Sequence, residues 1–189
     1  MVVTDDRKLF EKLRLFRCYG EKRKYQYVLK GGNYRLDEIQ AAILRVKLRY
    51  LDQWNEERRK RALIYKRKLE PTGVICPVEK EEAMHVYHLF VIRTKKRNSL
   101  QAFLKERGIE TLIHYPIPIH LQKAFRELGY RRGDFPLTEQ SSREILSLPF
   151  FPEMTESEME EVSTQIKTFN KTEVTPACRQ AGTNYEDCQ

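Results

Sequence analysis

The chain has 189 residues, of which 40% are hydrophobic and 33% charged, so it can form one folded core, or a small domain with part of another. No apolar run approaches the length of a membrane span, and no signal-peptide pattern is present, so we expect a cytoplasmic protein without membrane contact. The net charge of +8 would suit nucleic-acid binding, but acidic residues stand among the basic ones, as in the run 56–61, and no recognition motif accompanies them. We therefore expect solvated helix faces, whose positive field would also suit an anionic small molecule such as a phosphate or nucleotide.

The first thirty residues predict a short strand, a helix and a loop. Met1–Thr4 has the pattern of the end of a buried strand, and Asp5 or Asp6 is placed to cap a helix that continues to about Arg17. Residues 18–30 are polar and irregular, which indicates a loop. A single strand followed at once by a helix has no sheet to join, so we expect that a segment upstream of this strand is missing.

The stretch Lys-Gly-Gly-Asn-Tyr-Arg-Leu-Asp-Glu at residues 30–38 is a candidate anion site. Its two glycines permit backbone conformations that other residues disfavour, and Asn33 and Arg35 follow them at the expected start of a helix. Free backbone N–H groups and the positive end of the helix dipole would add to these two side chains in holding an anion. The alternatives are a simple turn, and an ion pair of Arg35 with Asp37 or Glu38.

Apolar residues recur at helical spacing from Leu36 to Leu69, which predicts one amphipathic helix on the order of 50 Å long. Pro71 and Gly73 are expected to end it. A helix of this length can bridge two domains or pair with a copy of itself, or it can serve only as scaffold.

Residues 74–170 change in character and predict a compact α/β unit. Its expected elements, in chain order, are a strand at 84–94, a helix that Asn98 caps and Gly108 closes, a strand at 109–113, helices at 119–128 and 137–145, a strand at 146–151, and a last helix opened by a capping box from Thr155 to Glu158. Residues 172–189 show no periodicity, so we expect a disordered tail there.

The second predicted strand is followed by His-Tyr-Pro-Ile-Pro-Ile-His at residues 114–120. Its two prolines stiffen the loop and exclude helix at the residues before them, and loops at strand ends are common places for ligand contacts. His114 and His120 have no third metal ligand nearby, so we expect no metal site. The cysteines, which lack metal-ligand spacing and are expected to be reduced thiols, are Cys18, Cys76, Cys178 and Cys188.

Taken in order, the motifs of this chain resemble the signature of the DegT/DnrJ/StrS sugar aminotransferases. The residues that carry the resemblance are Gly-Asn-Tyr-Arg-Leu-Asp-Glu-Ile-Gln-Ala-Ala at 32–42, Leu-Asp at 51–52, the stretch 58–65, Tyr-His-Leu-Phe at 87–90, Gly-Ile-Glu-Thr at 108–111, His-Tyr-Pro-Ile-Pro-Ile-His-Leu-Gln at 114–122, and Leu-Ser-Leu-Pro at 146–149. Each motif is weak alone, but the ordered set is specific, and it runs from Met1 to about Asn170.

The resemblance implies the carboxyl-terminal part of the aspartate-aminotransferase fold, the α/β fold of pyridoxal-phosphate enzymes of fold type I. Such enzymes move an amino group, usually from glutamate, to a keto group of a nucleotide-linked sugar, and the cofactor acts as the electron sink. Family members are homodimers with active sites between subunits. By this resemblance Asn33 would reach the cofactor phosphate of the neighbouring subunit with Arg35 beside it, and His114, Tyr115 and His120 would lie on the substrate side.

The chain departs from the family in one respect. The lysine that forms the Schiff base with the cofactor, and the aspartate that pairs with the pyridinium nitrogen, lie upstream of the position that matches the first residue. We therefore expect a carboxyl-terminal portion, from a truncated, split or fragmentary gene. Its predicted parts are a remnant of the large cofactor-binding domain with the active-site loop at 1–35, a long interdomain helix at 36–70, a small α/β domain at 71–170 and a disordered tail at 171–189.

Such a chain is expected to be inactive alone and to hold pyridoxal phosphate without a covalent bond. Its partner would be a second copy, or a chain that carries the missing amino-terminal portion, and its substrate a nucleotide sugar. The alternative functions are a non-catalytic remnant or interaction domain and, behind these, a basic nucleic-acid binder.

Overall fold

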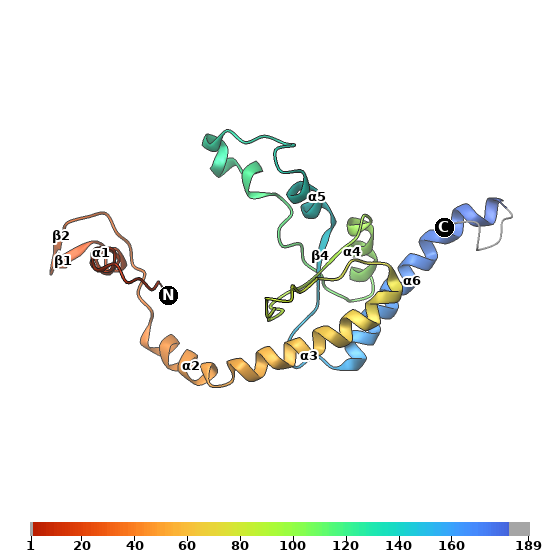
Figure 1. Cartoon of the computed structure of the whole chain (residues 1–189), viewed down its shortest axis with the longest axis horizontal. Helices are drawn as coiled ribbons and strands as arrows, with labels where there is room; N and C mark the ends of the chain where they lie inside the picture. Colours follow the sequence, from red (N-terminus) through yellow and green to blue (C-terminus); the bar gives the residue numbers. More distant parts are fainter. Residues whose placement is uncertain (1, 182–189) are drawn as a thin grey trace. The chain divides into compact units, whose positions relative to one another are not determined.

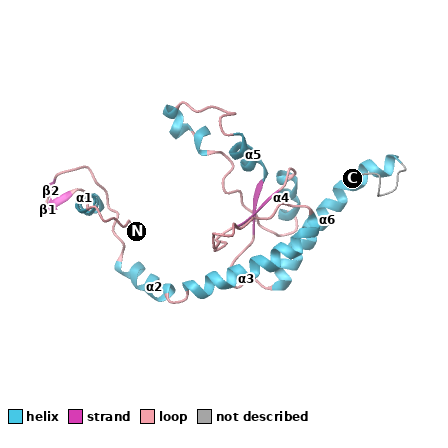
Figure 2. Ribbon diagram, in the orientation of Figure 1, coloured by secondary structure: helices cyan, strands magenta, loops and turns pink. Residues whose placement is uncertain are grey.

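The computed structural model describes residues 2–181 of the chain, with the side chains of residues 2–172 (Figures 1 and 2). The chain divides into two compact units, Met1–Leu51 and Asp52–Gln189, which Figure 1 draws in red to orange and in orange to blue. The boundary between the units therefore falls inside the helix predicted at 36–70.

The first helix, α1 (Arg7–Arg17), begins where the sequence predicts. The carboxylate of Asp6 accepts hydrogen bonds from the N–H groups of Lys8 (2.8 Å) and Leu9 (3.2 Å), which satisfies two of the free donors at the start of the helix. The strand predicted at Met1–Thr4 is wrong for residues 2–4, which form no strand because no strand of this unit pairs with them. Met1 lies outside the described residues.

A short antiparallel hairpin of β1 (Glu21–Arg23) and β2 (Gln26–Tyr27) replaces part of the loop predicted at 18–30. Its turn places Tyr25 at a φ of 65°, a left-handed conformation that glycine and asparagine adopt more easily. The N–H of Tyr25 donates to the Glu21 carboxylate (2.7 Å), which holds the turn. Because tyrosine is not a turn signal, the sequence pattern did not reveal the hairpin.

The helix predicted at 36–70 is two helices, α2 (Glu38–Leu48) and α3 (Leu51–Leu69). At the break the N–H of Arg49 donates to the carbonyl of Val46 (3.2 Å), three residues back instead of four, so the last turn of α2 tightens and the helix ends. No glycine or proline marks this position. The apolar spacing continues across it, and the prediction of a single helix was therefore wrong.

The second unit contains the antiparallel pair β3 (Phe90–Arg93) and β4 (Ile145–Leu148), with Val91 opposite Ser147. Both strands are shorter than predicted. β3 begins late because Tyr87 has a φ of 49°, which no extended strand accommodates. β4 ends early because Pro149 has no N–H group to continue the pairing.

The strand predicted at 109–113 is reduced to one antiparallel bridge between Leu112 and Ser147. The N–H of Ser147 donates to the carbonyl of Leu112 (2.7 Å), and the N–H of Leu112 donates to the carbonyl of Ser147 (3.2 Å). The pairing does not extend back to Thr111, because its carbonyl oxygen accepts the side-chain amide of Gln101 instead (3.1 Å).

The core forms where α3, α4 (Arg97–Lys105) and α6 (Glu156–Ala181) pack with the β3–β4 pair. Alternate strand residues point into it, as the period of two in a strand requires. These residues are Phe90 and Ile92 from β3 and Leu146 and Leu148 from β4, all nearly inaccessible to solvent. From α3 the ring of Tyr65 lies 4.9 Å from that of Phe90, centroid to centroid.

The segment predicted as helix at 119–128 forms two short 3-10 turns, Ile119–Leu121 and Lys123–Leu128. Phe125 has a non-helical φ of −116°, which interrupts the longer turn, so the prediction of a regular helix was wrong. The next helix, α5 (Pro136–Glu144), agrees with the prediction at 137–145. Proline suits its first position because no N–H is needed there.

The last helix, α6, begins with the predicted capping box. The N–H of Glu158 donates to Thr155 Oγ1 (3.3 Å), and the Glu158 carboxylate accepts the N–H of Thr155 (2.7 Å). The helix continues to Ala181, into the stretch 171–189 for which the sequence predicts a disordered tail. A helix already held by a packed first half needs only to be extended, which costs far less than nucleation. Residues 182–189 lie outside the described residues.

We predict that Tyr65→Phe raises the free energy of unfolding by about 1 kcal/mol, because the buried hydroxyl of Tyr65 has no hydrogen-bond partner in the described part of the chain. Chemical denaturation of both proteins measures the change. The matched control is Tyr87→Phe, which removes a hydroxyl bonded to Lys66 Nζ (2.9 Å) and the Glu79 carboxylate (3.1 Å) and should destabilise by about 1–3 kcal/mol. Equal destabilisation by both variants would contradict the prediction.

Candidate functional site

In the first unit, the segment that carries Asn33 is held against the end of α1. The N–H of Gly32 donates to the carbonyl of Phe16 (3.1 Å), and the N–H of Tyr34 donates to the carbonyl of Arg17 (3.0 Å). Asn33 itself forms an antiparallel bridge with Cys18. Where the sequence predicts a glycine-containing turn, the structure gives a backbone that hydrogen bonds hold against the end of α1.

Close approach of backbones explains the glycines of this segment. A Cβ atom at Gly31 would lie 2.6 Å from the backbone nitrogen of Gly20 and 2.8 Å from the carbonyl oxygen of Phe16. Gly20 has a φ of 76°, and a Cβ there would lie 1.8 Å from the carbonyl oxygen of Leu29. A side chain at either glycine would therefore push the neighbouring backbone segments apart. The glycines thus allow close backbone contact as well as unusual backbone angles.

The side chains of Asn33 and Arg35 interact with each other. Arg35 Nε donates to Asn33 Oδ1 (3.0 Å), and the N–H of Arg35 reaches the same oxygen at 3.4 Å. The amide oxygen of Asn33 is thus occupied, which leaves its Nδ2 group and the two terminal nitrogens of Arg35 as exposed donors. Within the described residues Arg35 makes no ion pair with Asp37 or Glu38, whereas Glu11 of α1 pairs with Arg7 (3.4 Å).

The predicted contribution of the helix dipole to this site is absent. α2 begins only at Glu38, with Asp37 as its N-cap residue, so Asn33 and Arg35 precede the helix and do not lie in its first turn. Two carboxylates already occupy the positive end of the dipole and disfavour a further anion there. An anion at this place is therefore held by side-chain donors.

In the second unit, His114 and Tyr115 lie together beside β4. His114 Nδ1 is 2.8 Å from Ser147 Oγ, and the ring of Tyr115 stands edge-on to the imidazole at 5.6 Å between centroids. His114 is half-buried, whereas Tyr115 is 73% exposed. The peptide bond between them is cis. Of the three predicted substrate residues, the structure thus brings His114 and Tyr115 together.

His120 lies in a different environment. Its side chain is only 7% exposed, and Nε2 lies 3.2 Å from the Glu139 carboxylate, which is itself buried. The N–H of Gly133 (2.7 Å) and then His120 hold the pKa of Glu139 below its usual range, and Phe135 packs on the imidazole at 4.8 Å. His120 thus joins the 3-10 turns to the start of α5, turned away from solvent.

Sequence reasoning missed a polar cluster around Glu79. The Glu79 carboxylate accepts hydrogen bonds from Arg59 of α3 (2.5 Å), from the N–H of His85 (2.7 Å) and from the hydroxyl of Tyr87 (3.1 Å). Arg59, followed by the N–H of His85, lowers the pKa of Glu79 to about 2. In the sequence, only the Tyr-His-Leu-Phe motif at 87–90 indicated that this segment matters. Glu79 itself stands in a run of charged residues, which is equally typical of a solvated loop.

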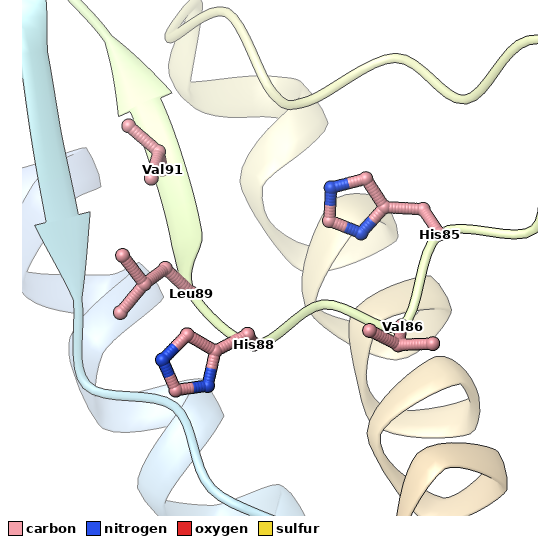
Figure 3. Close-up of a pocket in the computed structure, with 5 residues that line it drawn as sticks. All are labelled: His85, Val86, His88, Leu89 and Val91. Atoms are coloured by element: carbon pink, nitrogen blue, oxygen red, sulfur yellow. The ribbon is translucent and has the colours of Figure 1, made fainter. Parts of the chain in front are cut away.

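Beside this cluster lies an open pocket lined by His85, Val86, His88, Leu89 and Val91. Figure 3 shows Leu89 and Val91 on the same side of β3, with the two histidines on the segment that leads into the strand. Because Val91 lies opposite Ser147 in the sheet, the pocket borders the face of the sheet that carries His114. In the described part of the chain no three metal-ligating side chains gather, and no helix is long and apolar enough to cross a membrane.

Comparison with known proteins places this geometry in context. The sequence model of the DegT/DnrJ/EryC1/StrS aminotransferase family matches residues 1–167. The chain is 48% identical to the "Pleiotropic regulatory protein" of Geobacillus stearothermophilus over 89% of this chain and 46% of the relative. It is 45% identical to the dTDP-3-amino-3,6-dideoxy-alpha-D-galactopyranose transaminase of Aneurinibacillus thermoaerophilus, over 85% of this chain and 44% of the relative.

Among solved structures, the fold is similar to S. venezuelae DesV, with a TM-score of 0.80 and 39% identity over 89% of this chain and 46% of that one. A DegT DnrJ EryC1 StrS aminotransferase from Brucella abortus gives a TM-score of 0.78 at 32% identity, over 88% of this chain and 45% of that one. The chain therefore spans about half the length of the curated relatives it matches. The fold predicted from the motifs, the carboxyl-terminal part of a sugar-aminotransferase fold, is confirmed.

We predict that the Glu79 cluster makes stability depend on pH. The pKa of Glu79 is lowered from 4.5 to about 2 in the folded chain. The stabilising effect of the ionised Glu79 carboxylate is therefore complete above about pH 5 and is lost as the pH falls toward 2. The difference in unfolding free energy between the wild-type chain and Glu79→Gln should therefore shrink over this range, as measured by denaturant titrations at several pH values.

The control for this prediction is Glu82→Gln, which alters an exposed glutamate whose nearest cation is Lys80 at 3.9 Å. Such exposed pairs contribute little to stability. A pH dependence of the same size in both variants would show that the Glu79 cluster is not its source.

Proposed function

The chain belongs to the DegT/DnrJ/EryC1/StrS aminotransferase family, and we propose that it is the carboxyl-terminal part of a pyridoxal-phosphate-dependent enzyme that transfers an amino group to a nucleotide-linked keto sugar. The relative from Aneurinibacillus thermoaerophilus, a dTDP-sugar transaminase, supports this substrate class. The single observation that carries the proposal is the exposed pair of donors on Asn33 and Arg35, oriented by their mutual hydrogen bond.

The donors of Asn33 and Arg35 fit a phosphate group. The only acceptor of the pair, Asn33 Oδ1, is bonded to Arg35, so the groups left over are N–H donors and one positive charge. Guanidinium and amide donors of this kind suit phosphate oxygens. When bound, pyridoxal phosphate supplies the electron sink for amino-group transfer, which no side chain provides. In this chain Asn33 and Arg35 would hold its phosphate, on a backbone that α1 keeps in place.

His114 and Tyr115 would contact the sugar nucleotide. Nε2 of His114 has no partner within the described residues, and the hydroxyl of Tyr115 lies on the exposed side of the same loop. Both groups can hydrogen-bond hydroxyl or carbonyl oxygens of a sugar. His120, by its bond to Glu139, would shape the loop that presents them, and its predicted contact with substrate stays a prediction.

We infer that the covalent lysine lies outside the residues of this chain, in the amino-terminal portion of the enzyme, as the resemblance of the motifs to the family implies. An exposed apolar surface on α2 supports such a partner, because no residue of α2 is fully buried. Its apolar residues that are more than half exposed are Ile39, Ile43, Leu44, Val46 and Leu48. A surface of this kind marks a protein–protein contact. The same surface would also serve a non-catalytic interaction domain, which is the second candidate function.

Trapping with borohydride separates the two candidates. We predict that equimolar pyridoxal phosphate and borohydride label no single lysine of this chain alone, as read by peptide mass spectrometry. Addition of a polypeptide that carries the amino-terminal part of the Aneurinibacillus thermoaerophilus relative should produce one labelled lysine, on the added polypeptide. Stoichiometric labelling of a lysine of this chain would overturn the inference that the Schiff-base lysine lies elsewhere. Association of the two polypeptides without any cofactor binding would favour the interaction domain.

In the reconstituted complex, Arg35→Ala should weaken pyridoxal phosphate binding by about tenfold or more, because a charge-assisted hydrogen bond to phosphate is lost. Absorbance titration with the cofactor measures the dissociation constant. The control is Arg23→Ala, which removes the same charge from the exposed strand β1 of the same unit. If both substitutions raise the dissociation constant equally, Arg35 contributes only its positive charge and does not contact the phosphate.

A further inference from the structure

Ser147 is an unusual residue in its strand. Its neighbours Leu146 and Leu148 point into the core, so the side chain of Ser147 points to the opposite face of the β3–β4 pair. On that face it lies between Val91 of β3 and Leu112 on the other side. Ser147 is nevertheless only 4% exposed, so a hydroxyl is buried among apolar neighbours and needs a hydrogen-bond partner.

The hydrogen bonds of Ser147 leave one partner for its hydroxyl. Its backbone N–H and carbonyl are both used by Leu112 (2.7 and 3.2 Å). Its Oγ lies 2.8 Å from His114 Nδ1, and within the described residues no other group bonds to this oxygen. The hydroxyl proton of Ser147 therefore has a single acceptor available, the imidazole nitrogen.

Two arrangements of protons fit the distance between Ser147 and His114. If His114 carries its proton on Nδ1, this nitrogen donates to Oγ, and the buried hydroxyl proton of Ser147 has no acceptor. If Ser147 donates to Nδ1, both groups are satisfied and the imidazole proton sits on Nε2. A buried donor without an acceptor is costly, so the second arrangement is favoured.

We propose that Ser147 is a positioning residue that fixes His114 in the tautomer with its proton on Nε2, so that His114 presents an N–H donor to an oxygen of the bound sugar nucleotide. The assignment of the ligand rests on the proposed function, whereas the tautomer follows from the contacts of this chain. His114 then acts toward the sugar as a donor, and the edge-on ring of Tyr115 limits the rotation of the imidazole.

The other three histidines provide references for the test. Nδ1 of His85 accepts the N–H of Tyr87 (2.8 Å), and because a backbone N–H can only donate, His85 must carry its proton on Nε2. His120 is bound through Nε2 to a carboxylate, an acceptor that requires a proton on the same nitrogen. His88 is exposed and reports the behaviour of an unrestrained ring.

The experiment is nitrogen-15 NMR of the imidazole rings in the full chain, at a pH at which they are neutral, with resonances assigned by single histidine substitutions. We expect His114 to show one tautomer, with the pattern of His85. Ser147→Ala should shift the Nδ1 resonance of His114 and give the tautomer mixture of His88, with His85 unchanged. Ser147→Thr, which keeps the hydroxyl, should retain the wild-type pattern.

A proton on Nδ1 of His114 in the wild-type chain would overturn the proposal, and so would an unchanged His114 spectrum in Ser147→Ala. Unchanged resonances of His85 and His120 in that variant show that it is folded. The measurement needs neither cofactor nor partner, so it stands if reconstitution fails. The His114→Phe variant tests the substrate contact separately. If the tautomer is found but this variant leaves the KM for a nucleotide sugar unchanged in the reconstituted complex, the proposed substrate contact is wrong while the tautomer assignment stands.

Discussion

The second unit depends on the antiparallel pairing of β3 with β4. These strands are short, yet each side of the pair has a distinct task. The side that carries Phe90 and Leu146 is covered by α3, α4 and α6 and forms the core. The other side carries Val91 and Ser147, and through Ser147 it determines where His114 lies. A shift of one residue in this register would exchange the two sides, placing a hydroxyl in the core and leucines under the histidine.

In the first unit, close backbone packing takes the place of a core. Two glycines let the segment before Asn33 lie directly on the carboxyl end of α1, at distances that a Cβ atom would prevent. The donors of Asn33 and Arg35 are therefore presented from a fixed backbone although both side chains are exposed. Such preorganisation lowers the conformational entropy that binding of an anion must overcome.

The sequence predicted those features that local chemistry determines. Asp6 and the pair Thr155 and Glu158 marked helix starts correctly, and the ordered motifs identified the family and the partial fold. Features set by tertiary contacts or by residues in unfavoured conformations were missed. Tyr25 and Tyr87 adopt left-handed backbone angles, which a tyrosine in the sequence does not indicate. The hairpin at Tyr25 was therefore not predicted, and the strand that contains β3 was predicted too long. The break after α2 has no sequence marker, and the partner of Ser147 became visible only when Leu112 and His114 were placed beside β4.

The exposed apolar surface of α2 has a consequence for the abundance of the chain in a cell. A helix whose large apolar residues are all exposed to solvent is a target for chaperones and proteases, which continuously sort chains with such surfaces. If the partner covers this helix, the abundance of the chain will follow the supply of the partner, and molecules made in excess will be degraded. The stoichiometry of the assembly would then be set after synthesis, by survival of the paired chains.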